Sequence, residues 1–125
     1  MRKRSDTLTG QELEIMKVIW TLGGGTIRDV YDTLRERRTI AYTTVQTMMN
    51  ILESKGHLKK TPGEKASVYA PTQPQQQMVR SMVREFVNRV FDGSARPLLV
   101  HLAGEKGLTE RERKQLQKIL DKEGA

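Results

Sequence analysis

The residues best placed to do chemistry are short, uncharged side chains along one side of a predicted helix that begins near Ala41. In AYTTVQTMMNILESKG, apolar side chains follow the helical spacing i, i+3, i+4 and i+7 and must pack inward. The opposite side carries donors and acceptors of a size that suits base edges in a DNA major groove about 12 Å wide. Solvated helix faces are usually richer in Glu and Lys, so we interpret this side as a recognition surface. The inward residues are Val45, Met48, Met49 and Leu52, and the candidate DNA-binding residues are Tyr42, Thr43, Thr44, Gln46, Thr47 and Asn50.

A basic hairpin is predicted directly after this helix. Lys55-Gly56 is a helix stop, with a cation in the last turn and a glycine behind it. Two short β-like runs, 57–61 and 67–69, then flank the turn-rich segment Pro62-Gly63-Glu64-Lys65. Helix, glycine, strand, basic loop and strand is the order of a winged helix-turn-helix domain, in which the hairpin contacts phosphates beside the groove. The candidate phosphate contacts are Lys59, Lys60 and Lys65.

Two further helices are predicted before the recognition helix. Thr9-Gly10-Gln11-Glu12 is a capping-box pattern that starts a largely apolar first helix, which belongs at the centre of a small domain. Gly23-Gly24-Gly25 ends that helix in a turn, and Thr26 caps the second helix. In a helix-turn-helix domain the second element lies across the DNA backbone, so Arg28 is a candidate phosphate contact. A solvated surface arginine is the alternative.

The start of the recognition helix is open to two interpretations. Thr43-x-x-Gln46 fits a capping box, which would use both side chains on backbone amides. A helix that begins two residues earlier would leave both side chains available for DNA.

The region after the hairpin predicts a separate helical domain. Pro71 to Gln77 is polar and marked by prolines, so we place a winged helix domain at 1–72 and a helical dimerisation domain at 73–125. Its first helix has more apolar surface than an isolated tail can leave exposed, Ser94 and Pro97 mark the start of a second, and Thr109-x-x-Glu112 opens a third. The alternative is that the first of these helices folds back on its own winged domain. The candidate dimerisation residues are Met78, Met82, Val83, Phe86, Val87, Val90, Phe91, Leu98, Leu99, Leu102, Leu116, Ile119 and Leu120.

Three motifs carry a resemblance to a known family: ELEIMKVIW, IAYTTVQTMMNILESKG and Tyr69-Ala70-Pro71-Thr72. From Leu8 to Leu120 the chain resembles the penicillinase-repressor (BlaI/MecI/CopY) family of bacterial transcription regulators. The resemblance implies a mainly α fold with a small β-wing and a homodimer that represses genes by occupying a palindromic operator. It also implies that the start of the third helix meets the major groove. That start maps onto Thr43, Thr44, Gln46 and Thr47, and some relatives carry cations where this chain has Thr43 and Gln46.

The resemblance further implies how such a repressor is released. A membrane sensor protease cuts the second helix of the dimerisation domain, at an Asn-Phe pair in relatives, and the corresponding place here is His101-Leu102. The copper-responsive branch of the family uses a cysteine-rich tail, whereas this chain has no cysteine.

Composition narrows the remaining function classes. The 125 residues carry 22 Lys and Arg against 15 Asp and Glu, for a formal charge of +7, which favours a polyanionic partner. No disulfide, thiolate metal site, catalytic pair or cofactor motif is present, and the two histidines lack further ligands at metal spacing. No apolar run approaches the roughly 20 residues that span a bilayer, so we expect no membrane insertion. Met1-Arg2-Lys3-Arg4 is interpreted as a flexible basic arm of a cytoplasmic protein. The rival interpretation is a winged helix module that binds protein or RNA.

Overall fold

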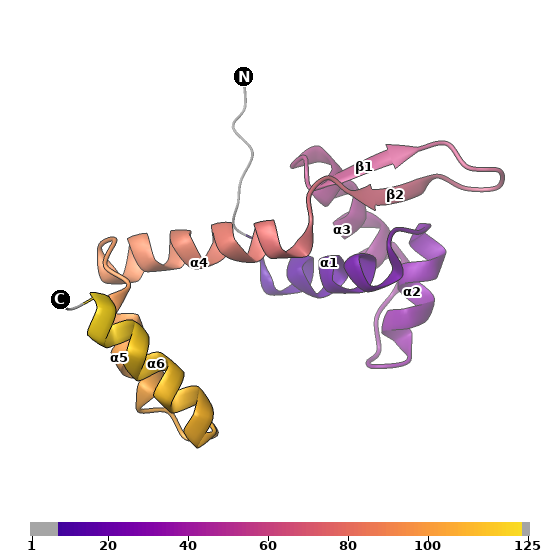
Figure 1. The fold of residues 1–125 in the computed structure, drawn as a ribbon. Coiled ribbons are helices and arrows are strands. Elements are labelled where there is room, and N and C mark those ends of the chain that lie inside the picture. The colour runs from indigo at the N-terminus through magenta and orange to yellow at the C-terminus, as the bar shows by residue number, and fades with distance from the viewer. Residues whose placement is uncertain (1–7, 124–125) are drawn as a thin grey trace. The chain divides into compact units, whose positions relative to one another are not determined.

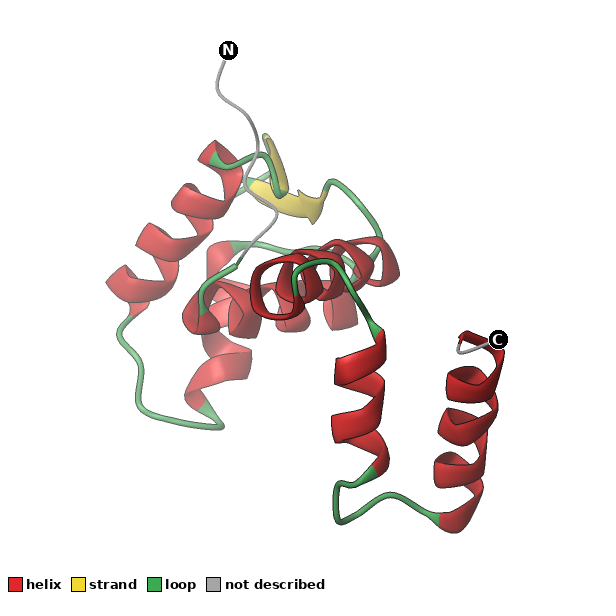
Figure 2. Ribbon diagram, turned by 90° about the vertical axis from the view of Figure 1, so that its left-hand side faces the viewer, coloured by secondary structure: helices red, strands yellow, loops and turns green. Residues whose placement is uncertain are grey.

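A computed structural model describes residues 8–123 as mainly helical, with one small antiparallel sheet. The predicted fold class, a winged helix-turn-helix followed by further helices, is confirmed (Figures 1 and 2). The interpretation of Met1 to Arg4 as a basic arm lies outside the described residues. The elements are α1 Gly10–Leu22, α2 Ile27–Arg35, α3 Tyr42–Ser54, β1 Leu58–Thr61, β2 Val68–Pro71, α4 Gln75–Phe91, α5 Arg96–Ala103 and α6 Glu110–Glu123.

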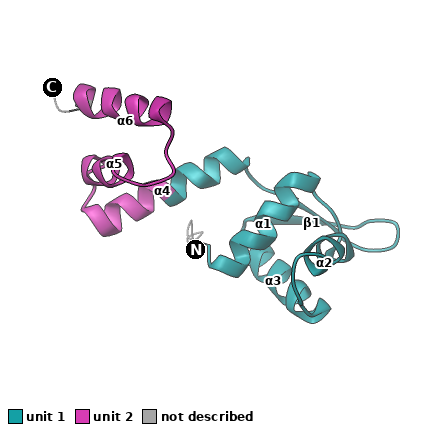
Figure 3. Cartoon of the chain, turned by 90° about the horizontal axis from the view of Figure 1, so that it is seen from below, with its two compact units in different colours: residues 1–82 teal, residues 83–125 magenta. Residues whose placement is uncertain are grey.

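The chain divides into two compact units, Met1–Met82 and Val83–Ala125, and the boundary falls within α4 (Figure 3). The first turns of α4 belong to the winged unit because Met78 joins its apolar core and Met82 packs against that core. The functional division between residues 72 and 73 stays a prediction.

Side chains at the N-termini of α1 and α2 fix where these helices begin. The Thr9 hydroxyl accepts from the Glu12 amide at 3.1 Å, and the Glu12 carboxylate accepts from the Thr9 amide at 2.8 Å. Thr26 and Asp29 make the same reciprocal pair at α2, at 3.1 and 3.0 Å. Both boxes satisfy amides that the helix itself leaves without partners.

The core of the winged unit is built from all of its helices and its hairpin. The apolar side of α1 lies at the centre, as its sequence predicts, and α2 and α3 both pack against it. Trp20 lies partly buried against this core and donates from its indole nitrogen to the carbonyl of Gln73 at 3.4 Å. The buried apolar residues are Leu8, Ile15, Met16, Val18, Ile19, Val30, Leu34, Val45, Met49, Leu52, Leu58, Tyr69 and Met78.

The Gly-rich turn does more than end α1. The Gly25 amide donates to the Tyr69 carbonyl at 2.9 Å, and the Tyr69 amide donates to the Gly25 carbonyl at 2.8 Å. This antiparallel bridge adds one residue of the turn to the edge of the hairpin. The turn that precedes α2 is therefore tied to β2.

A buried ion pair links α1 to the end of α3. Glu12 is almost fully buried, and its carboxylate oxygens lie 2.9 Å from the ammonium of Lys55, the residue that caps α3. Burial raises the pKa of Glu12, but the hydrogen bonds from Thr9 and the charge of Lys55 outweigh it and hold this pKa below its ordinary value. The Glu12 carboxylate thus takes part both in the N-terminal cap of α1 and in the contact between α1 and the end of α3.

The second unit holds the rest of α4 together with α5 and α6, which pack against each other. The ring of Phe91 lies 5.9 Å from that of Phe86 and 6.1 Å from that of His101, measured between centroids. Arg96 donates to the carbonyl of Leu120 at 3.0 Å. The predicted capping box between Thr109 and Glu112 is present at the start of α6.

Two expectations for the C-terminal helices are wrong. Ser94 does not cap α5, because the helix begins later and its N-cap residue is Ala95, which makes no side-chain cap bond. Met78 was assigned to dimerisation, yet it is 0% exposed within the core of its own chain. Met78 therefore stabilises the winged unit. For this first part of α4, the alternative interpretation, in which the helix folds back on its own winged domain, is the correct one.

Glu12→Gln is expected to lower the free energy of unfolding by about 1–3 kcal/mol at neutral pH, because it removes the charge that pairs with Lys55. Since the folded pKa of Glu12 lies below the ordinary 4.5, its contribution is complete above that value and is lost as the pH falls through the folded pKa. The variant should therefore lose less stability than the wild type between about pH 5 and pH 3.

Urea unfolding at several pH values measures this effect. Glu53→Gln, at an exposed position on α3, is the control and should change the free energy of unfolding by less than about 0.5 kcal/mol. Parallel pH profiles for the wild type and Glu12→Gln would contradict the prediction.

Candidate nucleic-acid interface

The start of α3 leaves its polar side chains available. The helix begins at Tyr42, and its N-cap residue Ala41 makes no side-chain cap bond. Thr43 and Gln46 therefore do not form a capping box, and the earlier helix start is the correct one of the two alternatives. Along the same helix Thr44 is half-buried, while the side chains of Thr43, Gln46, Thr47 and Asn50 are exposed.

The inner side of α3 explains this exposure. Val45, Met49 and Leu52 are completely buried against α1 and α2, as their spacing predicts. Because residues at this spacing share one face, the helix cannot turn its polar side inward without exposing them. The polar face of α3 is held outward by the core.

Two contacts place the loop and the first turn of α3. The guanidinium of Arg38 donates hydrogen bonds to the Glu14 carboxylate on α1, and the shortest distance is 2.8 Å. These charge-assisted bonds keep the pKa of Glu14 below its ordinary value. The Tyr42 ring meets the Tyr31 ring of α2 edge to face, with centroids 5.4 Å apart. Neither contact was predicted, because each joins residues that the sequence places apart.

A hollow of about 170 Å³ lies where α2, α3 and the hairpin meet. It brings together five of the predicted DNA-binding residues from three separate elements. None of its lining residues is a carboxylate, so the charges on its lining are the positive ones of Arg28 and Lys60. The predicted residues in it are Arg28, Tyr42, Gln46, Asn50 and Lys60, and those that sequence analysis did not assign are Thr26, Ile27, Ala66, Ser67 and Tyr69.

The two cations of the hollow are held loosely. Arg28 lies 3.3 Å from Asp32 one turn along α2, but its side chain is 63% exposed, and exposed pairs of this kind contribute little energy. Its guanidinium also lies 5.8 Å from the centroid of Tyr31. The ammonium of Lys60 lies 5.8 Å from the centroid of Tyr69. Both charges remain accessible to an anion.

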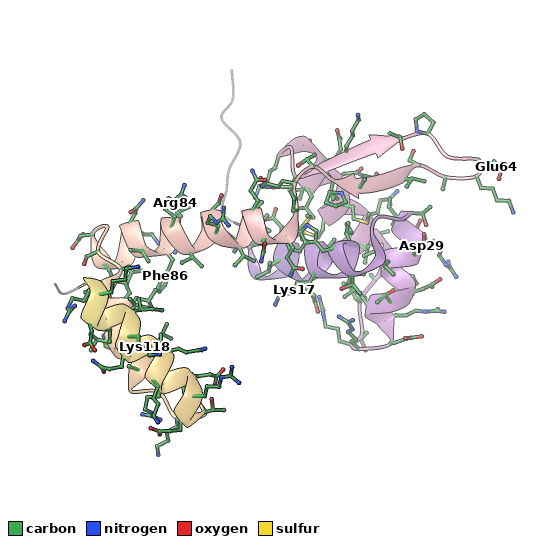
Figure 4. All side chains as sticks on the ribbon, in the orientation of Figure 1. Lys17, Asp29, Glu64, Arg84, Phe86 and Lys118 are labelled. Carbon is green, nitrogen blue, oxygen red and sulfur yellow. The ribbon has the colours of Figure 1, made fainter. Side chains whose placement is uncertain are left out.

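The three predicted hairpin lysines occupy different places. Lys60 pairs with Tyr69 across the hairpin, so these side chains share a face, whereas Lys59 pairs with Ala70 and lies on the other face. Lys65 follows Glu64 in the loop between the strands, where Figure 4 shows Glu64 at the far end of the hairpin. Only Lys60 of the three lines the hollow.

The predicted dimerisation residues differ in exposure. In the second unit, the buried apolar side chains among the described residues are Val87 and Leu120, while Phe91, Leu98, Leu99 and Leu116 are half-buried. Others project outward, and Figure 4 shows Arg84 and Phe86 leaving α4 on opposite sides. The exposed candidates are Val83, Phe86, Val90, Leu102 and Ile119.

Metal and membrane sites were also sought among residues 8–123. They contain no group of three or more His, Asp or Glu side chains that could hold a metal ion. His57 is buried beside β1, and His101 is exposed on α5. No helix in the described part of the chain is long and apolar enough to cross a membrane.

Comparison with known proteins decides the family. The family model described as penicillinase repressor matches residues 8–122. The chain belongs to the penicillinase repressor family. This is a family of DNA-binding transcriptional repressors, a class that is not enzymatic. One relative is the penicillinase repressor of Bacillus licheniformis, which is 27% identical over 95% of this chain and 93% of the relative. Another is the transcriptional regulator BlaI of Mycobacterium tuberculosis, which is 30% identical over 79% of this chain and 73% of the relative.

Solved structures agree with the family. The DNA-binding domain of the repressor BlaI matches with a TM-score of 0.54 and 31% identity, covering 59% of this chain and 90% of that domain. The oxidized form of MarR from E. coli matches with a TM-score of 0.52 and 15% identity, covering 94% of this chain and 76% of that one. The second likeness concerns the fold alone. The BlaI domain supports the winged helix, and the likeness in fold to MarR extends over the helices that follow it.

Gly24→Ala is expected to lower the free energy of unfolding by about 1–3 kcal/mol. Gly24 has a φ of +120°, which disfavours any side chain, and an added Cβ would lie 3.0 Å from the Tyr69 carbonyl that accepts from Gly25. The strain would act directly on the bridge between the turn and the hairpin. Urea unfolding measures the loss.

Gly10→Ala is the matched control, because an added Cβ at this position meets no atom within 4 Å. It should leave stability unchanged or raise it by up to about 1 kcal/mol. Equal effects of the two substitutions would contradict the role given to Gly24.

Proposed function

We propose that this chain acts as a homodimer that represses transcription by occupying a palindromic DNA operator. The start of α3 enters the major groove, where Thr43, Gln46 and Thr47 contact base edges. Arg28 and the hairpin lysines contact phosphates on either side. The observation that carries this proposal is the exposed, uncharged face of α3 beside a hollow lined with cations, in a chain of this repressor family.

A second copy is needed for recognition of an operator. One helix reads only a few base pairs, whereas a two-fold axis doubles the contacts and fixes the distance between half-sites at about one or more duplex turns. The second unit supplies apolar surface for such a contact, since Val83 and Val90 are each 49% exposed on one helix. Burying these side chains between two copies would drive association.

Release by proteolysis fits the position of the bond that corresponds to the cleavage site of relatives. His101 and Leu102 lie on α5, both side chains are exposed, and none of the residues of this helix is buried. A membrane sensor protease of the kind that the family resemblance implies could reach this helix in the cytoplasm after local opening. A repressor cut there would lose part of the surface that joins the two copies.

The interpretation as an RNA-binding module has less support. RNA readers of single strands stack bases on exposed aromatic rings. Tyr69 is 1% exposed, so Tyr42, which is 38% exposed and packs edge to face with Tyr31, is the one accessible ring of these two. The interface thus lacks an exposed pair of aromatic rings on the residues that were candidates for stacking.

Gln46→Ala and Thr47→Ala are expected to weaken binding to the operator by about tenfold each, and to weaken binding to random duplex DNA far less, because contacts to base edges carry the specificity. A duplex enriched from a random pool on the wild-type protein serves as the operator. Fluorescence anisotropy titrations on both duplexes at one salt concentration measure the ratio. Equal losses on the two duplexes would remove the role in base recognition.

Val83→Ser combined with Val90→Ser should raise the dissociation constant of the dimer by at least roughly a hundredfold, because four apolar side chains per dimer are lost. Arg84→Ser, beside Val83 on the same helix, is the control and should leave association nearly unchanged. Sedimentation velocity over a range of concentrations measures both. A wild-type chain that stays monomeric at high concentration would contradict the proposal.

A further inference from the structure

Tyr69 connects the three elements that surround the hollow. Its hydroxyl donates to the Oδ1 atom of Asn50 on α3 at 2.9 Å. Its backbone pairs in both directions with Gly25, just before α2, at 2.8 and 2.9 Å. Its ring faces the Lys60 ammonium on the neighbouring strand at 5.8 Å. Through its side chain and its backbone, one buried residue thus joins α3, the hairpin and the turn before α2.

The hydrogen bond from Tyr69 determines what Asn50 can offer to a ligand. A carboxamide has an oxygen that can accept two hydrogen bonds and an NH₂ group that can donate two. Because one lone pair of the oxygen accepts from Tyr69, both N–H donors of Asn50 but only one of its two acceptor sites remain for the hollow. A bidentate contact to adenine needs both the oxygen and the NH₂ group of one Asn. An oxygen turned toward Tyr69 is poorly placed for that contact, so Asn50 held in this way favours a ligand made only of acceptors.

The rest of the hollow favours the same kind of ligand. Arg28 and Lys60 contribute positive charge, Ser67 and Tyr42 contribute hydroxyls, and no lining residue is acidic. A phosphate group offers only acceptor oxygens and a negative charge, which matches these donors. Base edges in the major groove present mixtures of donors and acceptors and carry no net charge.

We propose that this hollow receives one phosphate group of the DNA backbone in each half-site, bound by the Asn50 amide together with Arg28 and Lys60, and that Tyr69 is the positioning residue that turns the amide toward it. The inference rests on the proposed function, because it names the part of the duplex that this site takes. It moves Asn50 from the residues that read base edges to those that fix the register of the protein on the duplex.

The test replaces the phosphates of an enriched operator duplex one at a time with neutral methylphosphonates. For the wild type, one position in each half-site should lower affinity by about tenfold or more, because a charge-assisted contact is lost there. In Asn50→Ala and Lys60→Gln the same replacement should cost much less, since the protein group is already gone. Lys59→Gln is the matched control: it lies on the other face of the hairpin and should keep the full loss at that position.

Tyr69→Phe keeps the ring and removes the hydroxyl, so it should reduce the loss at that same phosphate while leaving the loss at other phosphates intact. Urea unfolding reports whether this variant folds. If it does not, Asn50→Ala carries the test, because position 50 is exposed on α3.

The outcomes separate this inference from the proposed function. Specific binding without any phosphate whose replacement couples to Asn50 and Lys60 overturns the inference and leaves the repressor function standing. The inference is also overturned if Asn50→Ala changes the base preference at one position of the operator, since Asn50 would then read a base. Absence of binding to every duplex overturns both.

Discussion

The packing of one side of α3 against α1 and α2 is the constraint on which the rest of this structure depends. Val45, Met49 and Leu52 are all fully buried, and each contributes about 1.5–3 kcal/mol by leaving water. Rotating the helix would expose all three together. The polar residues of the opposite side therefore stay at the surface, because burying them would expose this apolar face.

Polar contacts then set the position of everything around that helix. The Arg38 guanidinium on Glu14 fixes the approach to its first turn, and Glu12 with Lys55 fixes its end. Tyr69 adds the hairpin and the Gly-rich turn through one hydroxyl and two backbone bonds. Helix α3 is thus held at its start, middle and end. Such a preorganised surface loses little conformational freedom when it binds DNA.

Local patterns allowed much of this fold to be predicted from the sequence. The capping box at Thr9 and Glu12, the apolar spacing of α3 and the loop that contains residues 62–65 between the two strands each depend on neighbours within a few residues. Contacts between distant residues leave no such local pattern in the sequence. The β-bridge between Gly25 and Tyr69 and the ion pair between Arg38 and Glu14 were therefore not predicted. The hollow was missed for the same reason, although five of its residues were predicted one by one.

The apolar stripe of α4 shows the limit of periodicity most clearly. Its spacing leaves open whether it contacts a second copy or folds back on its own winged unit, and the structure divides it: Met78 is buried in the winged unit, while Val83 and Val90 are exposed. The apolar stripe of α4 continues from one compact unit into the next, so sequence spacing cannot show where its burial in the winged unit ends. The exposure of each side chain in the folded chain does show this, because side chains that are buried in the core are distinguished from those that remain in contact with water.

Protection of guanine N7 from methylation tests most directly whether α3 recognises DNA from the major groove, where this atom lies. On a duplex enriched from a random pool, the account predicts two protected major-groove segments, related by symmetry and separated by about one duplex turn or a whole multiple of it. Protection confined to one segment, or none on a duplex that is nevertheless bound, would contradict it.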